Sequence, residues 1–155
     1  MDNAWIGIDP GAKGYICLLV PDQNKIGYMS NMASPMEIAD WLKTAKHEFN
    51  IKIVMLEQVR SIFGTSAKSN FSFGYNVGKV SGIVEASGLG VDLVLPKLWQ
   101  KEIGVRVKGN LVKKEVATIA KRIYPHAEIH GPKGGLDDGK SDYLMIAHYA
   151  YLKYR

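Results

Sequence analysis

Three features are scarce in this sequence, and each scarcity excludes a class of protein. The chain of 155 residues contains one cysteine, Cys17. A single cysteine forms no internal disulfide, and a cysteine-based zinc centre needs several such ligands. No apolar run approaches the ~20 residues that span a membrane, and the first residues lack the basic and apolar regions of a signal peptide. We therefore expect a cytoplasmic protein without a membrane segment, in which Cys17 is a buried apolar side chain.

The length and composition are those of one compact domain over residues 1–155. Hydrophobic residues make up 46% of the chain and charged residues 23%, an ordinary globular balance. The formal net charge is +5, and residues 97–122 hold eight Lys or Arg against two Glu. The positive charge is therefore concentrated in one stretch, which indicates a polyanionic partner such as nucleic acid.

Apolar runs and turn residues predict an α/β protein. Strands are expected at residues 5–8, 14–20, 25–29, 51–56 and 91–95, the first three as consecutive hairpins. Helices are expected from Ser34 to about residue 45 and at 69–86, 96–103, 111–124 and 140–154, with Ser34 and Asn110 as caps. This order predicts a central mixed five-stranded sheet with helices on both faces.

The expected helix over residues 69–86 carries a glycine stripe formed by Gly74, Gly78 and Gly82. Each glycine in a helix interior costs about 1 kcal/mol relative to alanine. We expect close packing against this face to offset that cost, by another helix in preference to a nucleic-acid backbone.

Carboxylates follow or precede the predicted elements at four places. Asp9 ends the first strand, Glu57 ends the fourth, and Asp137, Asp138 and Asp142 lie around the beginning of the last helix. Strand ends and helix starts meet at the rim of an α/β sheet. Mg²⁺ prefers carboxylate oxygens, and two such ions can clamp the attacking and leaving oxygens of a phosphodiester. Taken singly, each acid is equally explained as a turn, strand-exit, first-turn or solvated loop residue.

The last helix favours the site interpretation. Residues 143–152 are almost wholly apolar or aromatic, so this helix should be buried although Asp138 and Asp142 stand at its beginning. His148 lies within the apolar run and is expected to be a packed core histidine, whereas His126 and His130 are expected in a loop. Acids at the beginning of a buried helix fit a functional site better than a solvated surface.

Together these motifs resemble the RuvC-type Holliday junction resolvases of the RNase H-like superfamily. The resemblance spans residues 4–152 in the family's order, and it is closer to the phage branch than to the bacterial branch. It rests on residues 7–11 for the first-strand motif, 56–59 for the second acidic motif, 67–71 and 78–82 for the next helix, and 138–148 for the closing motif.

The resemblance implies an RNase H-like fold, a homodimer, and paired nicking of four-way DNA junctions with two Mg²⁺ ions per active site. Mn²⁺ would substitute for Mg²⁺, and no small-molecule cofactor is implied. Asp9 would bridge both metals, while Glu57 and Asp142 would each help to hold one. Bacterial members place the fourth acid three residues before the last aspartate, where this chain has Gly139. Asp138 is therefore the expected fourth acid, with Asp137 in reserve.

The basic residues and the loop after the second acidic motif suggest a path for DNA. Bacterial members carry a stacking aromatic soon after that motif, whereas this chain has Arg60 there and Phe63 as the nearest aromatic. Stacking on DNA and packing in the protein explain Phe63 equally well, and any single lysine is equally explained as solvated. The expected DNA contacts are Arg60, Phe63, Lys68, Lys79, Lys108, Lys113 and Lys114.

Three alternatives remain open. A nuclease of the same fold would cut flaps, forks or RNA–DNA hybrids, differing only in substrate geometry. A nucleotide-binding domain of the actin and sugar-kinase type is disfavoured because the chain is short and a second Asp-x-Gly loop is missing. An inactive junction-binding module is disfavoured because every acidic position is filled, although fold alone does not decide function.

Overall fold

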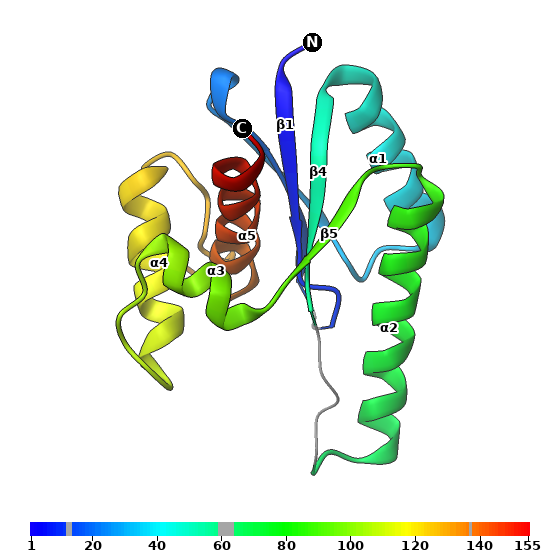
Figure 1. The fold of residues 1–155 in the computed structure, drawn as a ribbon. Helices are drawn as coiled ribbons and strands as arrows, with labels where there is room; N and C mark the ends of the chain where they lie inside the picture. The colour runs from blue at the N-terminus through cyan, green and yellow to red at the C-terminus, as the bar shows by residue number, and fades with distance from the viewer. Residues whose placement is uncertain (12–13, 59–63, 137) are drawn as a thin grey trace.

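A five-stranded mixed sheet forms the centre of the protein (Figure 1). The computed structural model describes residues 1–11, 14–58, 64–136 and 138–155. The strands are β1 (Asn3–Ile8), β2 (Tyr15–Val20), β3 (Lys25–Ser30), β4 (Asn50–Glu57) and β5 (Val91–Val94). Their order across the sheet is β3-β2-β1-β4-β5, with β1, β2 and β3 antiparallel and β1, β4 and β5 parallel. The predicted hairpins and mixed sheet are confirmed.

Helices cover both faces of this sheet, as predicted. One face carries α1 (Pro35–Glu48) and α2 (Ala67–Ala86), and the other carries α3 (Pro96–Ile103), α4 (Leu111–Ile123) and α5 (Asp138–Tyr154) (Figure 1). A short 3-10 helix, η1 (Pro21–Gln23), joins β2 to β3. The first half of α2 extends past the end of the sheet (Figure 1). Among the described residues, no helix is long and apolar enough to cross a membrane.

Strands β1 and β2 and the second half of β4 are buried on both faces, which divides the core into two layers. Successive strand side chains point to opposite faces of a sheet. The layer under α3, α4 and α5 receives Trp5, Cys17, Leu19 and Met55. The layer under α1 and α2 receives Ile6, Ile8, Ile16, Leu18 and Val54. The expected burial of Cys17 is confirmed.

Helix α5 is the central helix of its face and lies very close to β1. Every residue from Tyr143 to Ala150 is buried. A Cβ atom at Gly7 of β1 would collide with the backbone of Tyr143 and Ala147. Only glycine permits this close contact between strand and helix.

His148 is a packed core histidine, as predicted. Its ring is 9% exposed, and its Nδ1 atom lies 2.7 Å from the Tyr124 hydroxyl oxygen. Burial lowers the pKa of the imidazole, which favours the neutral ring. The buried pair joins the residue that follows α4 to α5.

The beginnings of the helices agree with the sequence in part. Ser34 forms the predicted capping box with Glu37, accepting a hydrogen bond from its backbone N–H at 3.2 Å. Helix α2 begins after a Ser66 cap, two residues earlier than predicted, and α5 begins at Asp138, two residues before the predicted start. The prediction for Asn110 was wrong, because its backbone is already helical and its side chain makes no capping hydrogen bond.

The glycine stripe of α2 faces outward. A Cβ atom added at Gly74, Gly78 or Gly82 would meet nothing within 4 Å among the described residues. The predicted close packing is therefore absent within one copy of the described chain. Val80 and Val84 hold α2 to the sheet from its opposite side.

Candidate active site

Asp9 and Glu57 lie side by side at the carboxyl edge of the sheet. Ile8 of β1 is in register with Leu56 of the parallel strand β4, so the next residue of each strand reaches the same level. Ile8 and Leu56 pack toward α1 and α2. Because strand side chains alternate, Asp9 and Glu57 are directed to the opposite face, which α5 covers.

The third carboxylate of this edge comes from α5. Asp142 lies one turn after the first residue of α5 and is half-buried, and its neighbour Tyr143 is buried. The close contact of α5 with Gly7 holds this end of the helix against β1. Strand β1, strand β4 and α5 thus contribute one acid each from positions far apart in the sequence.

Burial and mutual repulsion set the electrostatics of the three acids. Burial raises the pKa of Glu57 to about 7, although a hydrogen bond from Trp99 opposes the shift and the charges of Asp9 and Asp142 add to it. Burial also raises the pKa of Asp9, against a hydrogen bond from the Gly11 N–H. Both shifts reflect carboxylates with too little solvent to stabilise their charges, and the Glu57 shift also reflects its closeness to Asp9 and Asp142.

The charges of the three acids also act on Tyr143. Burial raises the pKa of its phenol, and the charges of Asp9, Asp142 and Glu57 raise it further. Tyr143 therefore packs beside the acids as a neutral phenol. In the sequence, nothing in the spacing of Tyr143 distinguishes it from the other aromatic residues of the apolar last helix.

The loop that carries Asp9 is held by two buried amides that sequence analysis missed. Asn31 donates to the backbone oxygen of Asp9 at 3.2 Å and accepts from the Gly14 N–H at 2.9 Å. Asn76 of α2 donates to the backbone oxygen of Pro10 at 3.0 Å. These bonds fix the loop backbone from both sides. A single asparagine in a turn or helix gives no sequence signal for such a role.

Glu57 has a second contact that the sequence did not reveal. The indole Nε1–H of Trp99, on α3, donates to Glu57 Oε2 at 2.6 Å. Trp99 is 1% exposed, and in the sequence it is indistinguishable from an ordinary core residue of a short amphipathic helix.

The packing around Gly139 bears on where the fourth acid can stand. A Cβ atom at Gly139 would lie 2.7 Å from the Tyr143 ring and 3.4 Å from the Gly14 Cα atom. A larger side chain at this position would collide with the Tyr143 ring unless that ring moved, so the packing around Tyr143 favours glycine at 139. Asp137 and the side chain of Asp138 lie outside the described residues, and the choice between them stays a prediction.

The acidic edge has oxygen donors for a metal ion, but its described side chains are not arranged around a cation. In residues 1–11, 14–58, 64–136 and 138–155, no three acidic, histidine or cysteine side chains converge closely enough to hold a metal ion as they stand. The donor chemistry still fits a hard divalent cation, because Asp9, Glu57 and Asp142 repel one another in a desolvated setting and offer oxygen ligands. Binding of a cation would relieve that repulsion and draw the carboxylates together.

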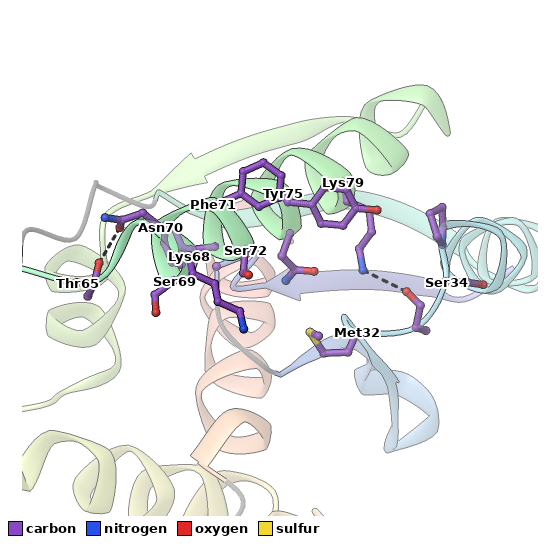
Figure 2. Close-up of a pocket in the computed structure, with 15 residues that line it drawn as sticks. Met32, Ser34, Thr65, Lys68, Ser69, Asn70, Phe71, Ser72, Tyr75 and Lys79 are labelled. Atoms are coloured by element: carbon purple, nitrogen blue, oxygen red, sulfur yellow. Dashed lines mark hydrogen bonds between the residues drawn. The ribbon is translucent and has the colours of Figure 1, made fainter.

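A groove of about 770 Å³ lies between α2 and the chain after β3 (Figure 2). Gly11, two residues after Asp9, is one of its lining residues, and Lys68 projects into the groove from the first turn of α2, with Met32 on the other side. The Lys79 ammonium donates to the backbone oxygens of Asn31 and Ala33, at 3.0 and 3.2 Å. Lys79 therefore joins α2 to the chain after β3, while Lys68 remains exposed.

The other predicted DNA contacts lie elsewhere or outside the described residues. Arg60 and Phe63 are among the residues that the structure does not describe. Lys108, Lys113 and Lys114 are exposed around the beginning of α4. The Glu115 carboxylate accepts hydrogen bonds at 3.1 Å from the backbone N–H groups of Arg106 and Val107, which ties this basic loop to α4.

Known structures place this arrangement among resolvase folds. The chain is similar to Thermus thermophilus RuvC in complex with Holliday junction substrate, with a TM-score of 0.63 and 20% identity over 98% of this chain and 94% of that chain. Another T. thermophilus RuvC structure gives 0.53 and 20% over 99% and 98%. The yeast mitochondrial Holliday junction resolvase Ydc2 gives 0.44 and 14% over 97% and 80%.

No family model and no curated protein sequence matches the chain. At one fifth identity the likeness to RuvC establishes the arrangement of the sheet and helices, and the closer resemblance to the phage branch stays a prediction. The chain has the RNase H-like fold of the RuvC Holliday junction resolvases, as its sequence predicted.

Proposed function

We propose that this protein is a metal-dependent DNA endonuclease that resolves four-way junctions and related branched DNA. The observation that carries the proposal is the sheet edge that brings half-buried Asp9 and Asp142 near enough to Glu57 for their charges to raise its pKa, on one face of a resolvase fold. The similar RuvC structure was solved with Holliday junction substrate. Hydrolysis of a phosphodiester at such an edge is the chemistry that these groups support best.

Mg²⁺, with Mn²⁺ as a substitute, would be held by Asp9, Glu57, Asp142 and Asp138. Two such ions supply an activated water and charge stabilisation for the leaving oxygen. The role of the rest of the protein is to hold these carboxylates in position. Gly11 fixes one oxygen of Asp9, at 3.0 Å, and the close contact at Gly7 fixes the beginning of α5.

The groove beside Gly11 is our proposed path for one DNA strand (Figure 2). Lys68 would contact phosphates, and the hydroxyl and amide groups of the first turns of α2 would add uncharged donors. Lys108, Lys113 and Lys114 offer a second basic surface around the beginning of α4. Lys79 is the weakest of the predicted contacts because its ammonium already bonds two carbonyl oxygens.

Paired nicking needs two active sites facing symmetric strands, so the proposal includes a homodimer. The outward face of α2 supports this part. It exposes Phe71 at 76% and Tyr75 at 62%, beside Gly74, Gly78 and Gly82. Two copies of α2 crossing at the three glycines would bring their open backbones together, which would supply the packing that the glycine stripe lacks within one copy.

The deciding experiment is cleavage of a labelled four-way junction in Mg²⁺, beside linear duplex, fork and flap controls. Asp9→Asn is the inactive variant, and Asp40→Asn, an exposed aspartate of α1, is its matched control. Paired symmetric nicks that Asp9→Asn abolishes and Asp40→Asn retains would support the proposal. Equal cutting of forks and flaps would make the protein a broader branch nuclease. Folded protein that binds the junction but cuts nothing would overturn the enzymatic proposal.

A further inference from the structure

Core packing fixes the position of Trp99 independently of its contact with Glu57. Helix α3 follows β5 through Leu95 alone, so it begins beside the carboxyl end of β4, where Glu57 lies. Trp99 and Ile103, one turn apart, are the buried residues of α3, and both belong to the core under α5. With 1% of its surface exposed, the indole ring has no freedom to follow a moving carboxylate.

The hydrogen bond from this ring to Glu57 is short and directional. Trp99 Nε1 lies 2.6 Å from Glu57 Oε2. An indole has one N–H and accepts nothing, so it engages one carboxylate oxygen and leaves the other to different ligands. Bonds to ionised acceptors are shorter and stronger than neutral ones. Asp9 and Asp142 repel Glu57, and the indole opposes that displacement.

A second buried tryptophan separates this role from simple burial. Trp5 belongs to the same core layer and is 4% exposed. Its Nε1 atom has no hydrogen-bond partner among the described residues, and its ring packs edge-on against Tyr151. The core layer therefore holds two buried indoles that differ in whether the N–H reaches an acid of the proposed site.

We propose that Trp99 is a positioning residue, which holds Glu57 Oε2 in place so that the other carboxylate oxygen is presented to a cation shared with Asp9 and Asp142. This inference rests on the proposed nuclease function. The indole never touches DNA or the cation, and it acts only through Glu57. Loss of its N–H should impair turnover and cation binding while leaving junction binding intact.

The test compares Trp99→Phe with Trp5→Phe, which removes the same group from the same core layer. Outer ligands of metal sites are worth about 10-fold to 100-fold in metal affinity or activity. We expect Trp99→Phe to lower kcat by about that factor and to raise the Mg²⁺ concentration for half-maximal rate, with the junction Kd unchanged. Trp5→Phe should cleave at the wild-type rate. Equal rates for the two folded variants would overturn the positioning role.

A second readout needs no activity and no folded Trp99 variant. In metal-free wild-type protein, the indole N–H signal of Trp99 should lie downfield of the Trp5 signal in a ¹H–¹⁵N spectrum, because only the former bonds a carboxylate. Glu57→Gln should move the Trp99 signal and leave the Trp5 signal in place. If neither indole signal moves on substitution of Glu57, the hydrogen bond between Trp99 and Glu57 is refuted. Wild-type protein that cleaves no junction would refute the nuclease proposal alone, since this spectrum still reports the contact between Trp99 and Glu57.

Discussion

Glu57 should make the metal-free protein less stable as the pH rises. Its pKa in the folded chain is about 7, against an ordinary 4.5, chiefly because the carboxyl is buried. Between these values the folded state keeps a proton that the unfolded state has lost, so the free energy of unfolding falls with increasing pH. The contribution of Glu57 is fully present below the unfolded pKa and is lost as the pH passes the folded pKa.

The size of this effect follows from the shift. At about 1.4 kcal/mol per pH unit the upper limit is about 3 kcal/mol, and solvent access to the half-buried carboxylate reduces the expected cost to about 2 kcal/mol. Glu57→Gln keeps an oxygen that accepts the Trp99 N–H but carries no charge. We therefore expect this variant to exceed wild type in stability by about 2 kcal/mol near pH 8, and by much less near pH 5.

Urea unfolding in EDTA measures the free energy of unfolding of wild type and of Glu57→Gln at each pH. The matched control is Glu102→Gln, an exposed glutamate of α3, which should follow wild type at each pH. Millimolar Mg²⁺ should narrow the gap at high pH, because a cation stabilises the wild-type carboxylate and not the amide. If the free energies of unfolding of wild type and Glu57→Gln differ by the same amount at low and high pH, the ionised Glu57 carboxylate does not destabilise the folded protein.

Three further changes test the geometry. Gly7→Ala places a Cβ against the backbone of α5 and should cost about 2 kcal/mol, a fall in Tm of about 5 °C; an unchanged Tm would contradict the close contact. Asn76→Leu leaves the Pro10 carbonyl unpaired and should cost about 1–3 kcal/mol while lowering kcat more than junction affinity, so a variant with wild-type kcat would remove Asn76 from the loop's support. Gly78→Arg fills open space and should leave each copy folded but monomeric by light scattering, whereas a persistent dimer would place the interface elsewhere.

The sequence predicted the features that depend on local patterns. Alternating apolar runs and turn residues located all five strands, and Ser34 with Glu37 marked the beginning of α1. Acids at strand ends were expected at one edge because parallel strands end together, and the register of Ile8 with Leu56 bears this out for Asp9 and Glu57. These inferences need only neighbours in the chain or the general geometry of a sheet.

The contacts that support the acids depend on distances across the fold, and the sequence carried no sign of them. Asn76 reaches Pro10 across a separation of 66 residues, and Trp99 reaches Glu57 across 42. A lone asparagine in a helix predicts an exposed amide, and a tryptophan in a short helix predicts core packing. The Asn110 error has a related cause, because a cap depends on backbone angles that the residue type only favours.

The position of Asp142 depends on three glycines, one each from a strand, a turn and a helix, that nothing in the sequence marks as special. Tyr143, its neighbour, lies between three of them: its backbone contacts Gly7, its hydroxyl occupies the space beside Gly14, and its ring fills the space beside Gly139. Consecutive residues of a helix point about 100° apart, so locking Tyr143 in this slot also fixes the direction of Asp142. A Cβ atom at Gly7 would push the backbone of α5 away from β1, and one at Gly14 or Gly139 would displace the Tyr143 side chain from its slot. The absence of three side chains therefore positions the third acid as firmly as any hydrogen bond does.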